Sequence, residues 1–217
     1  MRRNSGSVII LFARHPEPGK TKTRLAVDTG PAAAAQMYRV CAEHVYGAAK
    51  ATGFELLVSV PAQTPLEKMD AWLGAGQYHL QPGGTIGVKM RDAFEHVFKH
   101  GANRAILIGT DVPDVTSGLL TEAHAALQSD DVVIGPAMDG GFWLIGMNAA
   151  QPQLFANIEW STDTVYERTV QNAAQSGLSL GRVAMLRDID TYGALQEWLL
   201  EADEDHPLRR YMNAMSL

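Results

Sequence analysis

The chain has 217 residues, of which 46% are apolar and 19% are charged, a composition that excludes disordered and collagen-like proteins. Its formal net charge of -6 argues against nucleic acid as the main partner, because phosphate backbones are bound by a basic excess. The single cysteine, Cys41, excludes an intrachain disulfide and a cysteine-built metal site.

The chain starts with MRRNSGSVIILFARHPEPG, two arginines followed by a short apolar run. A small-residue cleavage site is missing, so this run predicts a first strand rather than a signal peptide. No later stretch reaches the length of about 18 apolar residues that a membrane span needs. We therefore expect a cytoplasmic protein without a membrane span, with one domain that covers residues 1–217.

Short apolar runs of strand length alternate with segments of helical periodicity along the whole chain. The expected strands are residues 8–13, 55–60, 78–81, 104–109, 131–137, 142–147 and 182–186. The expected helices are residues 31–52, 65–73, 86–100, 117–128, 163–176 and 191–201. The charged tail from Glu201 is expected to pack loosely.

Strand and helix alternation predicts a mostly parallel sheet covered by helices on both faces. The expected strands are continuously apolar, which is typical of strands buried on both sides. The strands at 131–137 and 142–147 are separated only by Met138 to Gly141. Because this connection is too short for a crossover helix, the sheet should include an antiparallel strand.

Ligands of such sheets bind beyond the carboxyl ends of the strands, so the loops there are the candidate sites. The loop after the first strand, ARHPEPGKTKTRLA, follows neither the Walker order nor GxGxxG. A basic loop that enters a helix can cradle phosphate, although a solvated basic loop gives the same pattern. The candidate phosphate-binding residues here are Arg14, Gly19, Lys22 and Arg24, with Lys20 as a further cation.

The loop after the third strand, QPGGTIGVKMRDAF, contains three glycines within five residues, Gly83, Gly84 and Gly87. Glycines let the backbone approach a ligand closely, so this segment is a candidate nucleotide contact. A plain glycine turn before a helix is the alternative. Gln81 at the start of the loop could hydrogen-bond a base edge.

Asp111 follows the fourth strand, where a carboxylate either caps a turn or holds a metal ion. Magnesium and manganese are bound by one or two carboxylates together with phosphates and water. A second carboxylate could come from Asp139, Asp188 or Asp190, although Asp190 could instead cap the last helix. The histidines lack HExxH spacing and no GxSxG elbow occurs, so a nucleophile-triad hydrolase is poorly supported.

Six segments together resemble the successive blocks of one bacterial family: FARHPEPGKTKTRLA, GGTIGVKMRDAF, IGTDVPDVTSGLL, GPAMDGGFWLIGM, EWSTDTV and RDIDTYGAL. That family is an uncharacterised, glycosyltransferase-like group of the nucleotide-diphospho-sugar transferase superfamily. The blocks keep their order over residues 11–195. The resemblance implies a three-layer α/β/α, Rossmann-like GT-A fold with a mostly parallel mixed sheet.

More distantly, the layout is similar to that of small guanylyltransferases for phospholactate and for the molybdenum cofactor. This resemblance implies that Lys22 and Arg24, in KTRL, contact nucleotide phosphates. It also implies that Asp111 holds Mg or Mn, with Asp190, or Asp188 in reserve, as the second ligand. The LAGGxSxRMG loop common among sugar nucleotidyltransferases is replaced here by a proline-containing loop at 13–20.

These observations predict a metal-dependent transferase that binds a nucleotide diphospho-sugar and passes the glycosyl group to a small-molecule acceptor. The metal and the basic loop, with Lys22 as a catalytic residue, would neutralise charge on the leaving diphosphate. Asp139 would act as a general base or hydrogen-bond the sugar. Gly140 and Gly141 would line the sugar or acceptor side.

Two alternatives stay open. A nucleotidyltransferase would use a nucleoside triphosphate, join the monophosphate to a phosphorylated acceptor and release pyrophosphate. A nucleotide-binding protein without activity, or a degenerate family member, would bind the nucleotide but catalyse no reaction. The base, the sugar, the acceptor and the oligomeric state are not determined by the sequence.

Overall fold

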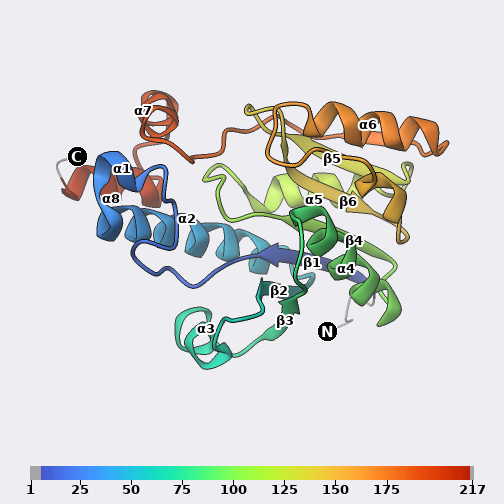
Figure 1. Cartoon of the computed structure of the whole chain (residues 1–217), viewed down its shortest axis with the longest axis horizontal. Helices are drawn as coiled ribbons and strands as arrows, with labels where there is room; N and C mark the ends of the chain where they lie inside the picture. Colours follow the sequence, from blue (N-terminus) through green and yellow to red (C-terminus); the bar gives the residue numbers. More distant parts are fainter. Residues whose placement is uncertain (1–5, 216–217) are drawn as a thin grey trace.

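The structure is a computed structural model that describes residues 6–215, with a mixed sheet at its centre (Figure 1). The strands are β1 Ser7–Phe12, β2 Glu55–Pro61, β3 Gln77–Gln81, β4 Arg104–Ile108, β5 Val132–Pro136, β6 Phe142–Met147 and β7 Leu180–Arg182. Their order across the sheet is β3-β2-β1-β4-β6-β5-β7.

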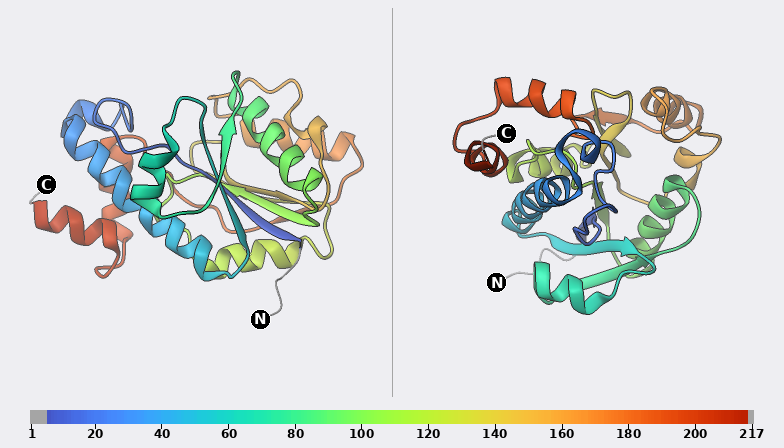
Figure 2. Two further views of the ribbon diagram at one scale, coloured as in Figure 1. Left: turned by 90° about the horizontal axis from the view of Figure 1, so that it is seen from below. Right: turned by 60° about the vertical axis from the view of Figure 1, so that its left-hand side comes forward.

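Helices lie on both faces of this sheet (Figure 2). They are α1 Ala26–Thr29, α2 Pro31–Ala51, α3 Leu66–Leu73, α4 Ile86–Lys99, α5 Ser117–Ala126, the 3-10 helix η1 Pro152–Phe155, α6 Val165–Gln175, α7 Tyr192–Glu201 and α8 Pro207–Met215. The predicted three-layer fold is confirmed. Within residues 6–215, no helix combines the length and apolar character needed to cross a membrane.

All strands run parallel except β6, which pairs antiparallel with both β4 and β5. This confirms the antiparallel element expected from the short connection between β5 and β6. The sheet is therefore mostly parallel, and the carboxyl ends of six strands lie at the same edge. The amino end of β6 lies at that edge as well.

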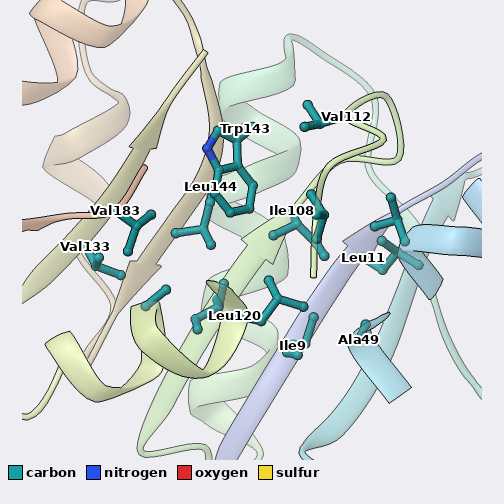
Figure 3. Packing of buried hydrophobic residues seen from close by; sticks show 14 of the residues in the cluster. Ile9, Leu11, Ala49, Ile108, Val112, Leu120, Val133, Trp143, Leu144 and Val183 are labelled. Carbon is teal, nitrogen blue, oxygen red and sulfur yellow. The ribbon is translucent and has the colours of Figure 1, made fainter. Parts of the chain in front are cut away.

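The central strands are buried on both faces, which explains their continuous apolar sequences. On one face, Ile9 and Leu11 of β1 belong to a cluster with side chains of α2 and α5 (Figure 3). On the other face, Ile10 packs in a cluster with Phe94 of α4. α4 was expected at residues 86–100, and it buries Met90, Phe94 and Val97 at helical spacing.

The last strand lies earlier in the chain than predicted. β7 covers Leu180–Arg182, whereas the expected strand was residues 182–186. Beyond Arg182 the pairing is reduced to an isolated bridge between Ala137 and Leu186. Val183 is buried in the core although it lies outside the strand. Only Val183 of this apolar run is buried, and Met185 is 56% exposed, so the run does not form a regular buried strand.

The expectation of a loosely packed tail is wrong, because residues 207–215 form α8. This helix is amphipathic and buries Leu208 and Met212 in a cluster with Met37 of α2 and Trp198 of α7. Figure 1 shows α8 beside α2. Most charged residues of the tail, such as Asp203, Glu204 and Asp205, precede this helix, and the helix itself is short, with two buried side chains.

We predict that Met212→Ala lowers the free energy of unfolding by about 2–5 kcal/mol, because Met212 is 1% exposed and its loss leaves a cavity. Met215→Ala on the same helix is the control. Met215 is 48% exposed, so its loss should change stability by less than about 0.5 kcal/mol. Urea denaturation measures both, and equal losses would contradict the packing of α8 described here.

Candidate active site

A pocket of about 390 Å³ opens at the carboxyl edge of the sheet. Its wall includes residues at the ends of β1 to β4 and at the start of β6, namely Phe12, Pro61, Gln81, Gly109 and Phe142. The connection after β1 crosses one face through α2, and the connection after β3 crosses the other through α4. The pocket thus lies where the strand order reverses, the usual ligand site of open α/β sheets.

An ion-paired triplet lies in the pocket wall and joins three loops. Lys22 Nζ lies 2.6 Å from Asp111 Oδ1 and 2.8 Å from Asp190 Oδ1. Ile189 N–H also donates to the backbone oxygen of Asp111 at 3.0 Å. The structure therefore brings together three of the predicted site residues, which are far apart in the sequence.

The charges of this triplet stabilise one another. Burial alone would lower the pKa of Lys22, but the carboxylates of Asp111 and Asp190 outweigh burial and raise it. Burial would raise the pKa of Asp190, but Lys22 and the nearby arginines outweigh burial and hold it below its ordinary value. Lys22 is therefore a cation and Asp190 an anion at neutral pH.

A buried hydroxyl network holds the loop after β1 against the end of β4. The Tyr38 hydroxyl accepts from the backbone N–H of Arg14 at 3.0 Å and contacts Thr110 Oγ1 at 3.0 Å. Thr110 in turn donates to the backbone oxygen of Phe12 at 3.3 Å. Burial raises the pKa of Tyr38 to about 12, so this phenol stays neutral. Neither Tyr38 nor this role of Thr110 was predicted, because Tyr38 belongs to the apolar face of α2.

Three further cations, Arg14, Arg24 and Lys89, line the pocket. None of them forms an ion pair with a carboxylate among residues 6–215. Lys20 differs, since it pairs with Glu17 at 2.7 Å. Lys89 was missed by the sequence reasoning, although a cation in the first turn after a glycine segment was a usable signal.

None of the four glycines predicted to contact phosphate or nucleotide, Gly19, Gly83, Gly84 and Gly87, is in the pocket wall. Gly19 and Gly84 have φ of +78° and +111°, which favour glycine in the turns they form. Gly83 lies in the same turn as Gly84, and neither it nor Gly84 is in the pocket wall. Gly87 lies outside the pocket wall and has a packing role, because a Cβ there would lie 2.3 Å from the Trp160 ring.

Gln81 is buried and lines the pocket as expected. Its Nε2 donates to the backbone oxygen of Ser59 at 3.1 Å. The amide nitrogen is therefore engaged with β2, and the amide oxygen is the atom that Gln81 can offer to a base edge.

The turn that contains Asp139, Gly140 and Gly141 does not line the pocket wall. Asp139 Oδ1 accepts from the backbone N–H of Gly141 at 2.8 Å, so this carboxylate stabilises its own turn. Gly140 has φ of +87°, and a Cβ there would lie 2.1 Å from the backbone oxygen of Asp163. The conformation and packing of the turn explain Gly140, and a Cβ at Gly141 would lie 3.0 Å from Asp139 Oδ1.

Asp188 is outside the pocket wall, and the charges of Asp139 and Asp190 act on it. Burial, followed by the charges of Asp139 and Asp190, raises the pKa of Asp188 to about 6. The predicted capping alternative for Asp190 does not hold, because Thr191 caps α7 by accepting from the backbone N–H of Ala194. Asp190 is thus free of the capping role and pairs with Lys22.

Asp111 and Asp190 fit a divalent ion in their donor chemistry. Both are hard oxygen donors and about half exposed, at 48% and 49% of their side chains. Among residues 6–215, no three His, Cys, Asp or Glu side chains gather closely enough to hold a metal ion. An ion bound by these two carboxylates would take its other ligands from water and phosphate, as magnesium does.

Comparisons with known proteins identify the family of the chain. The family model "Uncharacterized protein conserved in bacteria (DUF2064)" matches residues 33–162. The crystal structure of a protein from Desulfovibrio desulfuricans G20, provisionally named a nucleotide-diphospho-sugar transferase, is 31% identical. The match has a TM-score of 0.91 and covers 97% of this chain and 96% of that chain. The predicted family resemblance is confirmed.

Two more distant structures share the fold alone. Rv0371c from Mycobacterium tuberculosis H37Rv, in complex with manganese, is 15% identical with a TM-score of 0.56 over 92% of this chain and 100% of that chain. The 4-diphosphocytidyl-2C-methyl-D-erythritol synthase from Anaerococcus prevotii is 8% identical with a TM-score of 0.61 over 96% and 99%. No curated protein matches the sequence significantly.

We predict that Tyr38→Phe lowers the free energy of unfolding by about 1–3 kcal/mol, because it leaves the Arg14 N–H without its buried acceptor. Tyr46→Phe, on the same helix, is the control, since its hydroxyl makes none of the described hydrogen bonds. Chemical denaturation of both variants measures the difference. If the two variants are equally stable, the hydroxyl network does not hold the loop.

Proposed function

The chain belongs to the bacterial family DUF2064, and on this premise we propose that it is a metal-dependent glycosyltransferase. It would transfer a sugar from a nucleotide diphospho-sugar to a small-molecule acceptor. The observation that carries the proposal is the pocket in which Arg14, Arg24 and Lys89 surround the Lys22 ion pairs. The relative from Desulfovibrio desulfuricans, with its provisional name, supports this class of reaction.

The cations and the start of α4 suit the diphosphate of such a donor. Arginine offers a planar fork to phosphate oxygens, whereas lysine offers a point charge. α4 begins at the pocket, and its free N–H groups favour an anion there. A divalent ion on Asp111 and Asp190 would supply further charge neutralisation of the leaving diphosphate.

The general base is better assigned to Asp188 than to Asp139. The carboxylate of Asp139 is engaged by the backbone N–H of Gly141. Asp188 has a pKa of about 6, near the neutral pH at which a base would act. The acceptor would then enter from the side of the turn that contains Asp139, Gly140 and Gly141.

Nucleotidyl transfer is the second candidate, and one observation favours it. Lys22 and three further cations line the pocket, while the turn at 139–141 does not. Extra cations suit a nucleoside triphosphate, whose β- and γ-phosphates leave as pyrophosphate. The Anaerococcus synthase shares only the fold, so it does not decide between the two reactions.

We predict that Arg24→Ala weakens the binding of a nucleoside diphosphate by about ten- to a hundredfold, because a charge-assisted hydrogen bond contributes about 1.5–3 kcal/mol. Binding of the bare nucleoside should change little. Lys20→Ala is the matched control, since it removes a cation of the same loop that is paired with Glu17. Calorimetric titration compares the variants, and equal losses for both would show that Arg24 makes no special contact.

Phosphorus NMR separates the two reactions. With manganese and a panel of nucleotide sugars, we expect release of a nucleoside diphosphate, and we expect EDTA or Asp111→Asn to stop it. Pyrophosphate from a nucleoside triphosphate, without turnover of any nucleotide sugar, would establish nucleotidyl transfer instead. Turnover that persists both in EDTA and in Asp111→Asn would contradict the proposed metal dependence.

A further inference from the structure

Lys22 holds the position that a cation shared by Asp111 and Asp190 would take. Its Nζ contacts one oxygen of each carboxylate, at 2.6 and 2.8 Å, and its side chain is only 5% exposed. We propose that the Lys22 ammonium fills the divalent-cation site of the ligand-free protein, so that a metal ion must displace it. This inference rests on the proposed metal site at Asp111 and Asp190.

The backbone around Lys22 leaves the side chain as the part that can move. Leu25 is buried, and Thr21 is buried with its hydroxyl bonded to the backbone oxygen of Glu17 at 3.2 Å. Lys22 itself has φ of +49°, in the left-handed region that side chains rarely adopt. Such conformations persist where the surrounding structure fixes them, often at functional sites.

A phosphate bound in the pocket would offer the displaced ammonium a new partner. Lys22 lines the same pocket as Arg14 and Arg24, so its flexible stem can turn toward a phosphate bound there. A buried ammonium without a partner would be strongly unfavourable, so phosphate has to accept it when metal takes the carboxylates. Metal and phosphate should therefore strengthen each other's binding, as linkage requires.

Removal of the ammonium should expose the latent site. In Lys22→Met, two carboxylates would face each other without a cation between them, and manganese alone should relieve their repulsion. We expect this variant to bind manganese at least about tenfold more tightly than the wild type, a change of about 1.4 kcal/mol. Lys22→Arg keeps the positive charge and should bind manganese as weakly as the wild type.

The experiment titrates the full chain with manganese alone and measures the free ion by electron paramagnetic resonance. Lys22→Met combined with Asp111→Asn should lose the gain. Melting temperatures with and without manganese accompany the titration, and the ion should stabilise Lys22→Met more than the wild type. If Lys22→Met does not fold, Lys22→Gln replaces it with the same expectation.

Two results would overturn the inference: manganese binding by the neutral variants that is no tighter than in the wild type, or a gain that survives Asp111→Asn. Because the titration contains no nucleotide, sugar or acceptor, it is independent of the reaction. A failed titration beside nucleotide-sugar turnover would leave the proposed function intact. A successful titration without turnover would support the cation site and contradict the proposed glycosyltransferase function.

Discussion

The ion pairs of Lys22 with Asp111 and Asp190 hold the edge of the sheet together. Each residue comes from a different loop, and two carboxylates so close together would repel each other without the ammonium. The loop after β1, the loop after β4 and the segment before α7 therefore have one electrostatic centre in common. The other polar side chains of the pocket, including Arg14, Arg24 and Gln81, line the same wall as this centre.

The scaffold beneath this centre is rigid for identifiable reasons. β1 and β4 are neighbours buried on both faces, and α2, which follows β1, lies on the opposite face of the sheet from α4, which precedes β4. That arrangement opens a space between the two loops without disturbing the core. The Tyr38 hydroxyl then fixes how far the loop after β1 can lie from Thr110. A buried polar network of this kind specifies one loop position because each of its alternatives leaves a polar group unpaired.

Local periodicity predicted most of the fold, and the position of the loops after the strands predicted the edge of the sheet at which the candidate pocket opens. Apolar runs and helical spacing depend on nearest neighbours in the chain, so they can be seen in the sequence. The pairing of Lys22 with two acids, the packing of Gly87 under Trp160 and the place of Lys89 depend on contacts between distant segments. α8 was missed because it is short, buries only two side chains, Leu208 and Met212, and follows an acidic segment that dominates the composition of the tail.

The antiparallel strand β6 has a consequence for the order in which the molecule assembles. β6 lies between β4 and β5, and β7 joins only through β5, so the C-terminal strands add to a sheet that β1 to β4 begin. Asp190 follows β7 and arrives last of the three charged partners. During synthesis the ribosome releases Lys22 and Asp111 long before Asp190. The nascent chain therefore cannot complete its charged centre before Asp190 has emerged, and until then Lys22 and Asp111 can pair only with each other.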